Sequence, residues 1–323
     1  MKAVVYEKYG PPEGLEMKEV EKPAPKDDEV LIKIHAVSLN ASDWEFLTGK
    51  PLYARIRGLL KPKYKILGSD VAGRVEAVGK DVKQFQPGDE VFGDIFDCMG
   101  GFAEYVCAPE NTVMRKPASM TFEEAATFPQ AACITLKGLH DKGQIQPGQK
   151  VLINGAGGSM GTFAVQIAKS LSAEVTGVDK ARKLDMMRSI GADHVIDYTQ
   201  EDFTRNGQRY DLILDIAAYH SIADYRRALS PKGIYLMVGG SPTLLFKVLF
   251  LGPWISMIGG KKMGVLGMES NKGLDLIVEL FEAGKVVPVV DRRYPLSEVA
   301  EALRYLGNGQ ARGKIVITFE EYL

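Results

Sequence analysis

The sequence predicts an α/β protein that joins a β-rich domain to a doubly wound parallel sheet. Two observations predict this fold class. Short alternating segments separated by Gly and Pro turns occupy residues 1–125, which is typical of a barrel or sandwich. From residue 126 onward, short apolar strands alternate with helical patterns, which is typical of βαβ units. The length of 323 residues allows about two domains at roughly 150 residues each.

The first domain, residues 1–125, is expected to consist mainly of strands. Alternation of apolar and polar residues indicates a half-buried strand, and Pro87-Gly88-Asp89 marks a turn. Strands are expected at 30–36, 71–78, 90–92 and 102–106, with short helices at 41–47 and 122–127.

The second domain, residues 126–265, is expected to be a parallel sheet with connecting helices. Strands are expected at 150–153, 174–178, 194–196, 212–214 and 234–238, and helices at 162–171, 183–190 and 222–229. Residues 266–323 are expected to return along the molecule, completing this sheet and packing on the first domain. That return segment would contain helices 272–283 and 298–306 and a strand at 315–319.

Composition and charge exclude several classes of protein. Forty Lys and Arg residues against 41 Asp and Glu leave a net charge of −1, so the whole chain does not attract nucleic acid or anionic lipid. The N-terminus has no apolar run of signal-peptide length, and no segment has 18 uninterrupted apolar residues. We therefore expect a cytoplasmic protein with no nucleic-acid partner and no membrane insertion.

The most apolar segment is Leu244 to Ile258, which Lys247 and Pro253 interrupt. Its aromatic residues Phe246, Phe250 and Trp254 recur every four positions, so a helix would place them near one face. Three interpretations stay open: core packing, a lid over a substrate, or a contact with a second copy in a homodimer.

A glycine-rich turn predicts a dinucleotide site. It follows the strand at 150–153 and opens a helix, which is the context that such a site requires. Residues without side chains let the backbone approach a pyrophosphate, and the helix N-terminus favours its negative charge. The cofactor-binding residues expected here are Gly155, Ala156, Gly157, Gly158, Ser159, Met160 and Gly161.

The next strand ends at Asp179, 18 residues beyond Gly161, close to the spacing of an acid that binds a ribose hydroxyl. This acid favours NAD(H). Lys180, Arg182 and Lys183 follow it directly and would attract a 2′-phosphate, which favours NADP(H).

In these motifs the chain resembles the medium-chain dehydrogenases/reductases, and among them the zinc-lacking quinone oxidoreductase-like branch. The resemblance covers nearly the whole chain, in the segments MKAVVYEKYG, NASDW, LGSDVAGRVEAVG, QPGDEVFG, GGFAEYV, PGQKVLINGAGGSMGTFAVQIAK, GADHVIDY and RGKIVITF. It implies a GroES-like β domain plus a Rossmann domain. It also places Lys183 and Tyr198 near the adenosine phosphate or ribose, and Gly239 and Gly240 beside the nicotinamide. With Tyr198 included, NADP(H) is favoured and NAD(H) is the alternative.

Zinc members of the family hold a catalytic metal at three positions. Here Asn40, Ser69 and a residue near Gln130 or Ala131 stand at those positions, and none is a thiol or a histidine. The three cysteines, Cys98, Cys107 and Cys133, also cannot form a four-cysteine structural site. We therefore expect no zinc.

Without a metal, removing the proton of an alcohol is difficult, whereas adding hydride to a conjugated carbonyl needs only donors that stabilise a developing oxyanion. The expected activity is NAD(P)H-dependent reduction of a quinone or an α,β-unsaturated carbonyl. Asn40 is expected to orient the substrate or cofactor, and Asp43 to organise that loop, although both also suit a helix cap. The alternatives are a metal-free alcohol or aldehyde dehydrogenase and a non-catalytic NAD(P)-binding regulatory protein.

Overall fold

The computed structural model describes residues 1–56, 58–258 and 260–319. The chain divides into two compact units. Unit 1 contains Met1–Gln130, Ser270–Leu274 and Val290–Leu323, and unit 2 contains Ala131–Glu269 and Asp275–Val289. The first domain therefore extends to residue 130 rather than 125, and two later segments return to it.

Unit 1 is built around a seven-stranded sheet. Its strands are β3 (Glu29–Ser38), β4 (Asp70–Val78), β5 (Glu90–Asp94), β6 (Tyr105–Pro109), β7 (Met114–Arg115), β14 (Val290–Pro295) and β15 (Lys314–Thr318). The order is β14-β15-β3-β4-β5-β7, with β6 paired to β3. A separate antiparallel pair consists of β1 (Lys2–Val5) and β2 (Glu16–Glu19). The helices are α1 (Ala41–Thr48), α2 (Phe122–Thr127) and α9 (Val299–Gly307).

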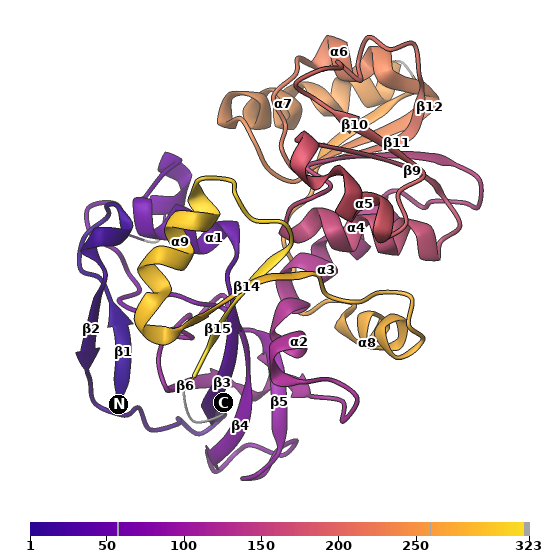
Figure 1. The fold of residues 1–323 in the computed structure, drawn as a ribbon. Helices are drawn as coiled ribbons and strands as arrows, with labels where there is room; N and C mark the ends of the chain where they lie inside the picture. Colours follow the sequence, from indigo (N-terminus) through magenta and orange to yellow (C-terminus); the bar gives the residue numbers. More distant parts are fainter. Residues whose placement is uncertain (57, 259, 320–323) are drawn as a thin grey trace. The chain divides into compact units, whose positions relative to one another are not determined.

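The return segment does not complete the parallel sheet, so that expectation is wrong. Strand β15 pairs antiparallel with β3, where Ile317 lies opposite Val37, and β14 pairs with β15. Figure 1 shows the yellow C-terminal strand β15 beside the purple β3. The alternating side chains of β15 fill the core of unit 1, where Ile315 and Ile317 are fully buried, and this burial fixes the pairing.

Unit 2 is a six-stranded parallel sheet. Its strands are β8 (Lys150–Asn154), β9 (Glu174–Asp179), β10 (His194–Asp197), β11 (Tyr210–Asp215), β12 (Leu229–Met237) and β13 (Lys262–Val265). The strand order is β10-β9-β8-β11-β12-β13. From β8 the chain adds strands first toward one edge of the sheet and then, from β11, toward the other, so the boundary between β8 and β11 is the switch point of a Rossmann sheet. The α/β fold class, with its parallel sheet, is confirmed.

Helices connect these parallel strands. They are α3 (Pro129–Leu136), continued by a π-helical turn at Lys137–Lys142, then α4 (Ser159–Ser170), α5 (Leu184–Ser189), α6 (Ile222–Ala228), α7 (Pro242–Ile258) and α8 (Leu274–Glu282). In the described part of the chain, no helix combines the length and apolar character needed to cross a bilayer.

Two further expectations differ from the structure. The strand expected at 102–106 begins only at Tyr105, because Phe102 and Ala103 instead approach β1, where Val4 N–H donates to Phe102 O (2.8 Å). The core-packing interpretation of the α7 aromatic residues is wrong: Phe246, Phe250 and Trp254 are exposed, whereas Leu244 and Val248 on the other face are buried.

Candidate active site

The glycine-rich turn connects β8 to α4 in the way that the sequence predicts. Gly155 has a left-handed backbone (φ +87°), which turns the chain sharply after Asn154. The N–H groups of Gly155 and Ala156 donate to Val178 O at 2.9 and 3.1 Å, so the turn is attached to β9. Gly158 then precedes the first residue of α4, Ser159. The turn is rigid and ends at a helix N-terminus.

The glycines of this turn are explained by different steric surroundings. A Cβ on Gly161 would lie 2.1 Å from Gly155 O, so only glycine lets α4 start this close to the turn. A Cβ on Gly157 would lie 2.6 Å from the Lys183 side chain. At Gly158 it would meet only Gly155 O, at 3.4 Å, so space stays open beside that backbone. The residues therefore fit a bound pyrophosphate, with Gly158 as the open position of the cradle.

Asp179 and Lys183 form a buried pair against this turn. Asp179 Oδ2 accepts from Gly157 N–H at 3.0 Å, and Oδ1 accepts from Lys180 N–H at 2.8 Å. The Lys183 ammonium lies 3.4 Å from the same Oδ2. Burial lowers the pKa of Lys183, and the Asp179 charge opposes that shift. The Asp179 carboxylate thus holds the turn in place, and the Lys183 ammonium partly neutralises its charge.

Tyr198 lies next to this pair, since its N–H donates to Asp179 O at 3.3 Å and its ring is exposed. Its ring centroid is 6.1 Å from that of Tyr219, which is also exposed. The two tyrosines present aromatic surface at the carboxyl ends of β10 and β11.

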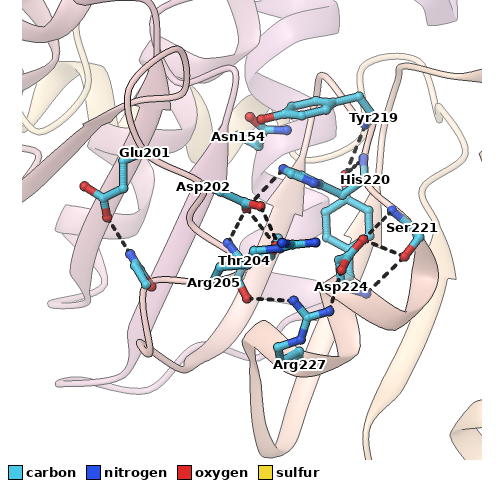
Figure 2. A network of polar contacts seen from close by, with 12 residues as sticks. Asn154, Glu201, Asp202, Thr204, Arg205, Tyr219, His220, Ser221, Asp224 and Arg227 are labelled. Atoms are coloured by element: carbon cyan, nitrogen blue, oxygen red, sulfur yellow. Dashed lines mark hydrogen bonds and ion pairs between the residues drawn. The ribbon is translucent and has the colours of Figure 1, made fainter.

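A polar network holds Tyr219 in place (Figure 2). His220 stacks on Tyr219, with centroids 4.1 Å apart, and its Nε2 lies 3.6 Å from Asp202 Oδ1. Asp202 also accepts from Thr204 N–H at 2.9 Å. The network joins the loop after β10 to the loop after β11.

Gly239 and Gly240 follow β12 and pack against the loop after β11. A Cβ on Gly240 would lie 2.4 Å from Ala218 N and O, and Ala218 N–H donates to Gly239 O at 3.2 Å. The close backbone approach explains why Gly240 is glycine. Whether this pair also lines the nicotinamide stays a prediction.

The sheet also places a polar pair at its switch point. Asn154 Nδ2 donates to Asp215 Oδ1 at 2.8 Å, between the ends of β8 and β11. Tyr235 Oη donates to the other carboxylate oxygen at 2.9 Å. Burial raises the pKa of Asp215 to about 6. Sequence reasoning missed Asp215, although a polar residue that ends an apolar strand beside the glycine turn was an available signal.

In unit 1, Asn40 and Asp43 form a capping box at the start of α1. Asn40 N–H donates to Asp43 Oδ2 at 2.8 Å, and Gly68 N–H donates to Oδ1 at 3.0 Å. Asp43 is fully buried, and burial raises its pKa to about 6. Asp43 thus joins the start of α1 to residue 68, and its part in the activity stays a prediction.

The amide of Asn40 belongs to a buried cluster with Asp70 and Lys314. Asn40 Nδ2 donates to Asp70 Oδ2 at 2.8 Å, and Asn40 Oδ1 accepts from Lys314 Nζ at 2.9 Å. Lys314 Nζ lies 3.6 Å from Asp70 Oδ2, and both side chains are fully buried. Burial raises the pKa of Asp70, and the Lys314 charge opposes it. Lys314 was missed because β15 is distant in sequence from β4.

Gln130 also contacts Asp70. Its backbone N–H donates to Asp70 Oδ1 at 3.1 Å, and its Oε1 accepts from Ser42 Oγ at 3.2 Å. Gln130 Nε2 is buried and has no hydrogen-bond partner in the described part of the chain. Asn40, at one position where the resemblance implies a metal ligand, and Gln130, at or next to another, thus both donate to Asp70, Asn40 through its side-chain amide and Gln130 through its backbone N–H. Within residues 1–56, 58–258 and 260–319, no three His, Cys, Asp or Glu side chains gather as metal ligands would.

Comparisons with known proteins agree with this architecture. Residues 26–118 match the alcohol dehydrogenase GroES-like domain, and residues 190–317 match a model described as zinc-binding dehydrogenase. The chain is 33% identical to a chloroplastic quinone-oxidoreductase of Triphysaria versicolor over 98% of both chains. It is 31% identical to the NADPH-dependent alkenal/one oxidoreductase of Arabidopsis thaliana, covering 98% of this chain and 79% of the relative.

Solved structures show the same likeness. The quinone oxidoreductase from Coxiella burnetii superimposes with a TM-score of 0.87 at 27% identity, covering 98% of this chain and 99% of that one. Full-length similarity above 30% identity, together with the two domain matches, is decisive. The chain therefore belongs to the medium-chain dehydrogenase/reductase superfamily, in its quinone oxidoreductase-like branch.

Proposed function

We propose that this oxidoreductase is a zinc-independent reductase that uses NADPH to reduce a quinone or an α,β-unsaturated carbonyl. The observation that carries the proposal is the amide pair in unit 1. Asn40 stands at a position where the resemblance implies a metal ligand, and its side-chain amide donates to Asp70. Gln130, at or next to a second such position, donates to Asp70 through its backbone N–H and leaves its side-chain Nε2 unpaired in the described part of the chain. Relatives whose names specify quinone and alkenal/one reduction support the substrate class.

Unit 2 supplies the cofactor site. The open backbone at Gly158 and the N-terminus of α4 would hold the pyrophosphate. Lys183 offsets the charge of Asp179, so a 2′-phosphate beside this pair meets less repulsion than a free carboxylate would impose. Tyr198 and Tyr219 present rings at the same edge of the sheet for the adenosine end. These contacts favour NADPH over NADH.

The chain's own residues would then stabilise the charge that forms on the substrate. A bound reduced nicotinamide supplies a hydride to the electron-poor carbon of the conjugated system. An asparagine amide has two N–H donors, and only one of those of Asn40 donates a hydrogen bond to Asp70. The second, with the unpaired Nε2 of Gln130, would donate to the substrate oxygen as it becomes negative. Lys314 and Asp70 hold Asn40 in that orientation, and solvent supplies the final proton.

A substrate panel tests this function. In one assay the purified protein is mixed with NADPH and small quinones, enones or alkenals. In a second assay it is mixed with NADP⁺ and simple alcohols. We expect NADPH oxidation with the conjugated carbonyls, unchanged by a metal chelator, and no oxidation of alcohols. Asn40→Ala and Gln130→Ala should lower kcat at least tenfold while leaving the Kd of NADPH unchanged. Alcohol oxidation that a chelator abolishes would instead support a metal-dependent dehydrogenase. The cytoplasmic location and the homodimer stay predictions from the sequence.

A further inference from the structure

Helix α7, orange in Figure 1, has an apolar face whose side chains are exposed to solvent. Phe250, Trp254 and Met257 are 73%, 66% and 81% exposed, and Phe246 and Leu249 are more than half exposed. These five residues recur three or four positions apart, so they share one side of the helix. We call them the α7 apolar face.

The inner face of α7 is firmly attached to unit 2. Leu244 and Val248 are buried in the core, and a Cβ on Gly252 would lie 2.7 Å from Met263 O, on β13. Ser256 Oγ also accepts from Met263 N–H at 3.1 Å. The helix is therefore fixed along the sheet, and its exposed side chains point outward from a rigid support.

Basic residues border this face. Residues 225–268 contain six Lys and Arg and no Asp or Glu, a local imbalance that the net charge of −1 conceals. Lys247 lies on α7 itself, Lys261 directly precedes β13, and Lys262 is the first residue of that strand. Lys261 Nζ donates to Arg226 O at 2.5 Å, so the Lys261 ammonium is held beside the backbone of another basic residue. In the described ranges, none of these four cations has a carboxylate within ion-pair distance.

We propose that the α7 apolar face docks on a lipid bilayer that contains anionic phospholipid. Aromatic and aliphatic side chains on a helix with neighbouring lysines are the combination that lies in a membrane interface, with the apolar side chains among the acyl chains and the cations at the headgroups. The helix lies on the membrane without crossing it, because its inner face stays buried in unit 2.

A second copy of the chain fits this face less well. A twofold interface brings the same surface together from both copies. Lys247, Lys261 and Lys262 would then face the same basic surface of the other copy, because residues 225–268 contain no carboxylate to pair with them. Anionic headgroups supply the missing charge. If the proposed function holds, docking would also bring the enzyme to the phase in which an apolar quinone or enone concentrates.

Vesicle sedimentation of the full chain tests the inference. We expect binding to vesicles of phosphatidylcholine mixed with phosphatidylglycerol, weaker binding at raised salt, and little binding to phosphatidylcholine alone. The Phe250→Ser/Trp254→Ser variant should lose at least tenfold in partition coefficient, and Lys247→Glu/Lys262→Glu should lose the preference for anionic vesicles. Met17→Ser, which alters an exposed apolar residue among the glutamates of β2, is the matched control and should bind as the original chain does. Thermal unfolding checks that each variant is folded.

Two outcomes would overturn the inference. Unit 1 has another exposed apolar segment, with Ile56 and Leu60 at 87% and 89% exposure. If Ile56→Ser/Leu60→Ser loses vesicle binding while Phe250→Ser/Trp254→Ser still binds, the docking surface is that segment of unit 1. The second outcome is a dimer in light scattering that Phe250→Ser/Trp254→Ser dissociates, together with no vesicle binding by any form of the protein. That result would make the α7 apolar face a contact between copies. Neither outcome depends on turnover, so the proposed function is tested separately.

Discussion

The Lys183 ammonium lies 3.4 Å from the Asp179 carboxylate, and both side chains are buried against the glycine-rich turn. Asp179 is the residue whose position suggests a ribose-binding acid, yet it already accepts from the N–H groups of Gly157 and Lys180. The two residues therefore act together: the acid fixes the turn, and the lysine offsets the acid's charge where a 2′-phosphate would bind.

Lys183→Gln should reverse the cofactor preference. Loss of the cation leaves Asp179 to repel a 2′-phosphate, so the Kd of NADPH should rise at least tenfold, equivalent to about 1.4 kcal/mol, whereas that of NADH should change little. Nicotinamide fluorescence measures both constants. Lys232→Gln is the control, since Lys232 is an exposed lysine of unit 2 that lies on β12 and not on this loop. A larger effect in the control, or an NADH preference in the unaltered protein, would contradict this assignment.

Two alanine substitutions in the turn should separate folding from cofactor binding. Gly158→Ala adds a Cβ that meets only Gly155 O at 3.4 Å, so the fold should persist while dinucleotide affinity falls at least tenfold. Gly161→Ala adds a Cβ 2.1 Å from the same oxygen, so it should lower the thermal midpoint as well. Calorimetric titration with NADPH and thermal unfolding distinguish the two effects. Unchanged affinity in Gly158→Ala would show that this backbone does not contact the cofactor.

Lys314→Met should destabilise unit 1. The substitution leaves Asp70 buried without its cation, and breaking such a pair costs about 3 to 5 kcal/mol. Adding Asp70→Asn removes the other charge and should recover part of that loss. Urea unfolding followed by Trp44 fluorescence, in a Trp254→Phe background, reports on unit 1 because the chain has only two tryptophans. Equal stability of Lys314→Met and the parent would refute the structural role of the pair.

Asp215 should make stability depend on pH in a defined window. Its folded pKa of about 6 is above the ordinary value near 3.9, so the folded state holds the proton more tightly than the unfolded state. Its stabilising contribution is complete below about pH 4 and disappears as the pH rises through about 6. Relative to Asp215→Asn, the original protein should lose on the order of 2 to 3 kcal/mol between pH 4 and 7. Urea unfolding followed by circular dichroism measures the difference, and a constant difference across this range would contradict the burial effect.

Local patterns were enough to predict the glycine-rich turn and the two elements that it connects. The strand, the glycines and the helix that follow one another from 150 to 170 need no distant partner, and the structure has β8, the turn and α4 in those places. The capping box of Asn40 and Asp43 is local in the same way. Periodicity likewise indicated most of the strands of unit 2.

Contacts between distant segments could not be predicted in this way. Lys314 and Asn40 are 274 residues apart, and only the pairing of β15 with β3 brings them together. For the same reason the return segment was assigned to the wrong sheet. The α7 pattern was ambiguous for a different reason, because an apolar helical stripe is the same whether it packs in a core, covers a substrate or contacts a second copy. Only the exposure of Phe250 and Trp254 decides against the core.

Deuterium transfer tests the proposed reaction most directly. The protein is incubated with an enone and NADPH labelled with deuterium in turn at each C4 position of the nicotinamide, and the product is analysed by NMR and mass spectrometry. We predict that one of the two labels appears at the β-carbon of a saturated ketone. Deuterium at the carbonyl carbon of an unsaturated alcohol, or no transfer despite demonstrated NADPH binding, would contradict conjugate reduction.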